Sequence, residues 1–116
     1  MALDLKDTAN LFVNSIGTAV KNVTGQDAPA IEGFAQNQLQ SLAHQSALIT
    51  GMIEANQFTD DELKFYLIGL KQMAMGFAQT LIGMIVVEVQ RLFNAIVTAI
   101  YTSINTLAKV ALPLPV

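Results

Sequence analysis

Apolar side chains return every three or four residues over three long stretches of the chain, and this is the period of an α-helix. The first stretch covers residues 3–24 and places five apolar side chains on one face: Phe12, Ile16, Ala19, Val20 and Val23. Gly25 follows it directly, at the position where glycine commonly ends a helix. The pattern therefore predicts a short amphipathic N-terminal helix within residues 1–25.

A second helix is expected over residues 29–57, because Pro29 suits a first helical turn and Glu32 suits the positive end of the helix dipole. Small or apolar residues recur along it at Ile31, Ala35, Leu39, Leu42, Ser46, Ile49 and Ile53. Thr59 and Glu62 then have the spacing of a capping box, in which each side chain binds the backbone N–H of the other residue. A short turn of this kind joins two helices that lie nearly antiparallel.

The third stretch runs over residues 60–112 and contains no proline before Pro113. As one helix it would be about 80 Å long, against about 43 Å for the second helix. We therefore predict an all-α fold: a helical hairpin with a very long C-terminal helix and a short N-terminal helix, packed in an oligomer, with an extended tail at 113–116. A break between Glu88 and Asn94 is the alternative, and it would allow a compact bundle.

Charged residues are scarce in the C-terminal part of the chain, where residues 72–116 contain only Glu88, Arg91 and Lys109. Over the whole chain they make up 13%, about half of the roughly 25% that is usual for soluble domains. A chain of 116 residues has little interior in which to hide its apolar surface. The composition therefore favours an oligomer or a contact with a membrane.

The apolar arc of the last helix is wide enough to pack against more than one neighbour. We expect it to mediate self-association through Leu92, Phe93, Ile96, Val97, Ile100, Ile104 and Leu107. Glu88 and Arg91 are three residues apart and would form an ion pair that fixes the register between copies. The opposite face carries a polar line, which indicates a solvated face or a polar groove in an assembly: Arg91, Asn94, Thr98, Thr102, Asn105 and Lys109.

Gly69, Gly76 and Gly83 are seven residues apart, so that they lie in one line on a helix. Each costs up to about 1 kcal/mol relative to alanine in a helix interior. Close packing of two helix backbones would compensate for this cost. The second helix offers a matching line of small residues: Ala43, Ala47 and Gly51. The alternative is that the three glycines are incidental.

Residues that could carry catalysis or bind metal are few. His44 is the single histidine, and Ser41 lies three residues before it, but no acid stands nearby to orient the imidazole as in a serine hydrolase. The chain contains no cysteine and no Glu-x-x-His pair. Its net charge of −3 argues against nucleic-acid binding. We therefore expect no enzymatic activity, no cofactor or metal, no nucleic acid and no small-molecule substrate.

These patterns favour a non-enzymatic structural subunit that self-assembles through apolar helices, as a component of a filament, shell, virion or bundle. The alternative is a membrane-associated, membrane-lining or pore-forming protein, although residues 67–87 include Lys71, Gln72 and Gln79. In architecture the expected hairpin resembles subunits of helical filaments, secretion needles and pore-forming or virion-lining proteins, without a shared motif. The N-terminus lacks the basic start and apolar run of a secretory signal, and the sequence predicts no compartment.

Overall fold

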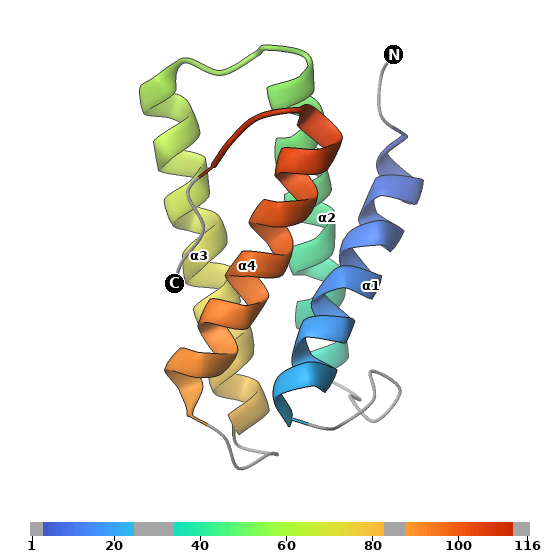
Figure 1. The fold of residues 1–116 in the computed structure, drawn as a ribbon, viewed down its shortest axis with the longest axis vertical. Coiled ribbons are helices and arrows are strands. Elements are labelled where there is room, and N and C mark those ends of the chain that lie inside the picture. The colour runs from blue at the N-terminus through green and yellow to red at the C-terminus, as the bar shows by residue number, and fades with distance from the viewer. Residues whose placement is uncertain (1–3, 25–33, 83–87, 113–116) are drawn as a thin grey trace.

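The computed structural model describes residues 4–24, 34–82 and 88–112. These ranges contain four α-helices: α1 (Leu5–Thr24), α2 (Phe34–Glu54), α3 (Asp60–Ile82) and α4 (Val89–Ala108). Consecutive helices run in opposite directions, and α1 lies beside both α2 and α4 (Figure 1). The prediction of an all-α fold is confirmed.

The predicted single helix over residues 60–112 is wrong, because α3 ends at Ile82 and α4 packs back against it. One helix of that length would measure about 80 Å, whereas the longest dimension of the molecule is 40 Å. Glu88 has an extended backbone (φ −71°, ψ 129°) directly before α4, and its carbonyl accepts a hydrogen bond from the N–H of Leu92 at 3.1 Å. The return of the chain lets α4 bury its apolar arc, which a straight helix would leave in water.

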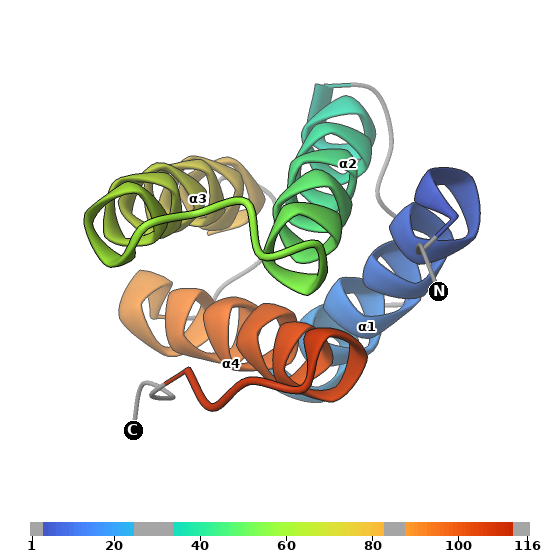
Figure 2. The ribbon, with the colours of Figure 1, turned by 90° about the horizontal axis from the view of Figure 1, so that it is seen from above.

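The helices α2 and α4 form the centre of the bundle, since they contact each other and both remaining helices. Within the described residues α1 and α3 do not touch, and they lie on opposite sides of the central pair (Figure 2). Each of these outer helices therefore buries one face and exposes the other. This arrangement decides which surfaces remain free for contacts with other molecules.

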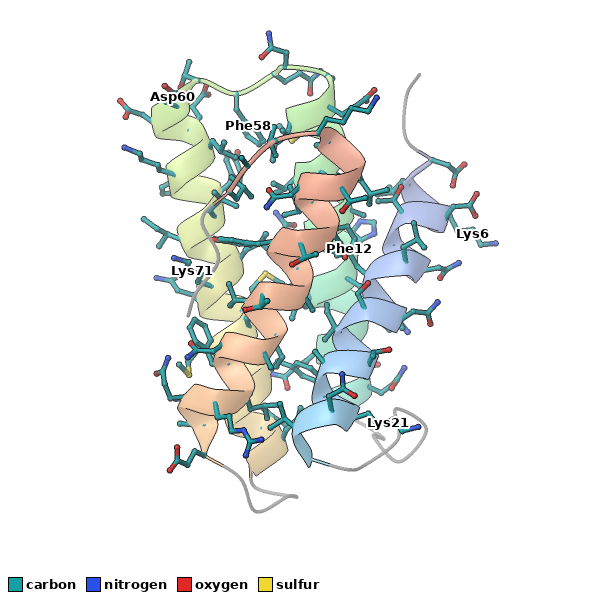
Figure 3. All side chains as sticks on the ribbon, viewed as in Figure 1. Lys6, Phe12, Lys21, Phe58, Asp60 and Lys71 are labelled. Carbon is teal, nitrogen blue, oxygen red and sulfur yellow. The ribbon has the colours of Figure 1, made fainter. Side chains whose placement is uncertain are left out.

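Apolar side chains from all four helices form the core. Phe12 of α1 is fully buried in the interior, whereas Lys6 and Lys21 of the same helix point outward (Figure 3). The largest fully buried side chains are Phe12, Phe77, Ile16, Leu39, Leu42, Ile49, Leu70, Leu81, Leu92, Ile96, Ile100 and Ile104. The core thus contains most of the residues that the sequence assigned to the apolar seams of the first two helices.

Hydroxyl groups allow α2 to bury polar residues without burying charge. The Ser46 hydroxyl donates to the Leu42 carbonyl at 2.7 Å, and the Thr50 hydroxyl donates to the Ser46 carbonyl at 2.7 Å. Both side chains are fully buried. A buried hydroxyl that is hydrogen-bonded within its own helix avoids the cost of an unpaired polar group.

The predicted capping box fixes the start of α3 and is confirmed. The Thr59 N–H donates to Glu62 Oε1 at 3.0 Å, and the Glu62 N–H donates to Thr59 Oγ1 at 3.2 Å. The hydrogen bond from the Thr59 backbone lowers the pKa of the Glu62 carboxyl most, and the Thr59 side chain lowers it further, because both interactions favour the ionised form. Asn56, in the turn that follows α2, has a left-handed backbone (φ 56°), which asparagine tolerates better than most residues.

After α4 the chain turns back toward α3. Lys109 ends the helix in the left-handed region (φ 56°, ψ 49°). The side-chain amide of Asn105 then makes two bonds with the Leu112 backbone: its Nδ2 donates to the carbonyl at 3.2 Å, and its Oδ1 accepts from the N–H at 2.8 Å. These bonds hold Leu112 beside Ile68 and Tyr101, with which it lines a groove.

Candidate interaction surfaces

Among the described residues, no group of three or more His, Asp or Glu side chains is arranged so that it could hold a metal ion. His44 and Ser41 are both exposed on α2, and no hydrogen bond joins them. The features of the described surface that bear most on function are therefore its possible contact surfaces.

The apolar arc of α4, expected to face other copies, lies against the chain's own helices. Leu92, Ile96 and Ile104 are fully buried, Val97 and Ile100 are nearly so, and Phe93 and Leu107 pack partly buried against the same core. The helices α1, α2 and α3 all contact α4. The single chain therefore already covers the surface that the sequence assigned to self-association, and we do not retain these residues as the contact between copies.

The expected close packing of backbones at the glycines is not found. A Cβ atom built on Gly51, Gly69 or Gly76 would meet no other atom within 4 Å. Gly83, the third glycine of that line, lies outside the described residues. Ala43 and Ala47 of α2 are buried in the core, but no neighbouring backbone approaches the glycines of α3. These glycines leave open space beside the helix instead.

Glu88 and Arg91 also occupy positions other than those expected. Glu88 is the residue directly before α4, its side chain caps no N–H group, and it is exposed. Arg91 is exposed on the first turn of α4, and within the described residues no ion pair joins the two side chains. Both therefore lie at a solvent-facing end of the bundle rather than in its interior.

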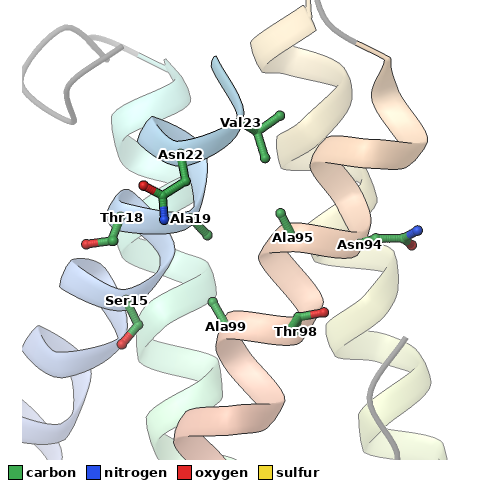
Figure 4. A pocket seen from close by; sticks show the side chains of 9 residues that line it. All are labelled: Ser15, Thr18, Ala19, Asn22, Val23, Asn94, Ala95, Thr98 and Ala99. Carbon is green, nitrogen blue, oxygen red and sulfur yellow. The ribbon is translucent and has the colours of Figure 1, made fainter. Parts of the chain in front are cut away.

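A shallow, uncharged groove of about 400 Å³ runs between α1 and α4 (Figure 4). It is lined by Ser15, Thr18, Ala19, Asn22, Val23, Asn94, Ala95, Thr98 and Ala99. Farther along the same two helices, the Ser103 hydroxyl donates to the Ser15 hydroxyl at 3.1 Å. The polar line expected on the last helix thus includes two residues of this groove, Asn94 and Thr98. The groove contains no charged or aromatic group that would select a ligand.

The outer face of α3 exposes large apolar side chains, and we call Phe65, Tyr66, Ile68 and Met73 the outer α3 surface. Phe65 is 72% exposed and Ile68 is 56% exposed. A depression of about 350 Å³ lies over Gly69, between these four side chains and Gln45 of α2. Tyr66 packs against Phe58 and Phe65, with ring centroids 5.0 and 5.7 Å apart. Isolated exposed apolar residues are common, but a continuous group of this kind is typical of a contact surface.

Helical periodicity did not identify the outer α3 surface, because α3 is apolar on more than one side. Leu70, Ala74 and Phe77 face the core, whereas Phe65 and Ile68 lie on the opposite side of the same helix. The available signal was the presence of two large apolar residues outside the buried seam. The two faces could be distinguished only once the packing of α3 on α2 and α4 was established.

A second groove, of about 450 Å³, lies on the other flank of α3, and we call it the Tyr101 groove. It is lined by Asp60, Leu63, Lys64, Leu67, Ile68, Lys71, Tyr101 and Leu112. The Lys71 ammonium lies 5.8 Å from the centre of the Tyr101 ring, within the range of a cation–π contact. Burial raises the pKa of the Tyr101 hydroxyl, because desolvation disfavours the phenolate. Ile68 lines both this groove and the depression over Gly69, so it forms the ridge between them.

The described helices include none that is both long enough and apolar enough to cross a membrane. Comparison with known proteins adds no relative: no protein family, no curated protein and no solved structure matches the chain.

Proposed function

We propose that this chain is a non-enzymatic structural subunit that self-associates, and that its copies meet through the outer α3 surface. The observation that carries the proposal is the exposure of Phe65 and Ile68 on a helix whose opposite face is buried. The surface of α1 offers a contrast. Its exposed apolar side chains, Leu5 and Leu11, are six residues apart and do not share a face, and Lys6 and Asn10 are exposed beside them.

The size of the exposed apolar area indicates how strongly the copies would associate. Full burial of a phenylalanine or isoleucine side chain contributes about 1.5–3 kcal/mol. With Phe65 72% and Ile68 56% exposed, two copies would gain roughly 4–8 kcal/mol from these four side chains. A dissociation constant of 1 μM corresponds to about 8.2 kcal/mol, and association has its own entropic cost. The association is therefore expected to be weak, with a dissociation constant no lower than about 1 μM.

The test is sedimentation velocity of the whole chain from 10 to 500 μM, with two variants and one control. Wild type should shift toward a larger species as concentration rises, whereas Phe65→Ser and Ile68→Ser should remain monomeric. Leu11→Ser is the matched control, because Leu11 is 49% exposed on α1. It should associate as wild type does. A wild type that stays monomeric at 500 μM, or a control as impaired as the two variants, would overturn the proposal.

A lipid surface is the alternative occupant of the same face, because Lys64 and Lys71 flank apolar residues as in helices that lie on anionic membranes. Flotation with phosphatidylcholine vesicles, with and without phosphatidylserine, distinguishes the two. Self-association predicts that the protein stays in the bottom fraction with both vesicle types. Recovery of wild type, but not of Phe65→Ser, with the floating vesicles would replace self-association by membrane attachment.

A further inference from the structure

The charges on α3 are arranged so that they can complement a second copy of the same helix. Asp60 lies at the start of α3, and Lys64 and Lys71 follow on the same flank, where all three line the Tyr101 groove. Figure 3 shows Asp60 and Lys71 on the outward side of this helix. Asp61 is exposed one residue after Asp60. Along this flank the order is therefore acidic first and basic afterwards.

This order favours one direction for a second α3 helix. A parallel copy would bring Asp60, Asp61 and Glu62 against the same three acids, because equal residues then lie at equal heights. An antiparallel copy brings the acidic start of each helix toward the basic part of the other. In an antiparallel pair, a flank of one helix lies beside the equivalent flank of the second helix. The acids of that flank in one copy therefore face the lysines of that flank in the other.

We infer that two copies of this chain bind through antiparallel α3 helices related by a two-fold axis, with Phe65 of each copy packed on Ile68 of the other. This inference rests on the proposed function and specifies its partner and geometry. A two-fold contact uses one patch that complements itself, so each contact occurs twice. Phe65 and Ile68 are the two most exposed large apolar side chains on the described surface.

The register follows from that pairing. If residue 65 lies opposite residue 68, antiparallel geometry places residue 61 opposite residue 72. Asp61 of one copy then lies beside Lys71 of the second copy, again twice. The two helices overlap over residues 60–73, a length of about 21 Å at 1.5 Å per residue. Residues 74–82 of each α3 extend past the partner helix.

The absence of cysteine from the sequence makes this register directly testable by disulfide formation. Asp61→Cys and Gln72→Cys place single thiols at two exposed positions. Under mild oxidation, a mixture of the two variants should give a covalent heterodimer, whereas each variant alone should give little. Efficient crosslinking of each variant with itself would overturn the antiparallel inference and leave self-association intact. A wild type that never associates would overturn both.

Charge reversal provides an independent test. Lys71→Glu should weaken association about tenfold, because both symmetric contacts become repulsive. The double variant with Asp61→Lys and Lys71→Glu should restore it. Lys6→Glu, exposed on α1, is the control and should have no effect. Failure of the double variant to associate better than Lys71→Glu would contradict the proposed register, provided that both retain the wild-type circular dichroism spectrum.

Discussion

Truncation of Ile100 tests whether the apolar arc of α4 belongs to the core of one chain or to a contact between chains. Ile100 is 1% exposed and lies in the cluster to which all four helices contribute. Ile100→Ala removes three buried carbon atoms, which corresponds to about 2.4 kcal/mol at about 0.8 kcal/mol each. The cavity left behind raises the expected loss to about 3–4 kcal/mol. This is a large part of the roughly 5–15 kcal/mol that stabilises a typical domain.

Urea unfolding followed by circular dichroism at 222 nm measures this loss. With a slope of about 1.5 kcal/mol per M of urea, the midpoint should fall by about 2 M. The fall should be the same at 5 and 200 μM protein, because the contacts that are lost lie within one chain. Leu11→Ala removes the same number of carbon atoms from a side chain that is 49% exposed, and it should cost about 1 kcal/mol or less.

Two outcomes would refute the assignment of Ile100 to the monomer core. If Ile100→Ala unfolded at the wild-type urea concentration but lost the ability to associate, the arc would have to lie between copies. A midpoint that falls for Ile100→Ala only at the higher protein concentration would lead to the same conclusion. Either result would restore the interpretation that the sequence pattern first favoured.

Three further variants test other parts of the fold. Thr59→Ala removes the capping box and should destabilise the protein by about 1 kcal/mol. The pKa of Glu62 is lowered in the folded state. The contribution of this carboxylate to stability is therefore present above its ordinary pKa of 4.5 and is lost as the pH falls through the pKa of the folded state. The difference in Tm between wild type and Thr59→Ala should therefore be smaller at pH 3 than at pH 7, and an unchanged difference would contradict this linkage. The pKa of Tyr101 is raised in the folded state. The contribution of the neutral hydroxyl to stability is therefore present below the ordinary pKa of 10.0 and is lost as the pH rises through the pKa of the folded state. Between pH 9 and 11 the Tm of Tyr101→Phe should therefore fall less than the Tm of wild type. An equal fall would argue against this linkage. Gly76→Ala should raise the free energy of unfolding by up to about 1 kcal/mol, since an added Cβ meets no atom within 4 Å; a lower Tm would mean that a close contact does exist there.

The end of α1 and the start of α3 followed from local signals in the sequence. Thr59 and Glu62 begin α3 as a capping box, whose two hydrogen bonds join groups three residues apart. Gly25 follows the last residue of α1 in the sequence, where glycine is common. Local hydrogen bonds of this kind depend little on the rest of the fold. They could therefore be predicted without knowing which helices pack together.

The division between α3 and α4 could have been predicted from a signal that was interpreted differently. Gly83 directly follows Ile82, the last residue of α3, and glycine is common just after a helix. After Met84 the sequence continues with Ile85, Val86 and Val87, and β-branched residues favour helix less than leucine or alanine do. The even spacing of Gly69, Gly76 and Gly83 suggested helix packing instead, and that interpretation concealed the end of α3.

The location of the free apolar surface depended on tertiary structure. The shortage of charge in residues 72–116 correctly indicated extensive burial, but burial within the chain and burial between chains leave the same pattern in the sequence. Ile96 and Ile100 are covered by the other helices, whereas Phe65 and Ile68, in a more highly charged part of the chain, are exposed. Only the packing of the four helices separates the two cases.

The bonds between Asn105 and Leu112 have a practical consequence for anyone who attaches a label to this protein. They hold Leu112 beside Ile68 and Tyr101, so a fluorophore or affinity handle fused directly after Leu112, in place of residues 113–116, would emerge next to α3. Such a fusion would interfere with assembly measurements through steric hindrance alone. A handle joined ahead of α1 would emerge on the far side of the bundle and leave α3 accessible.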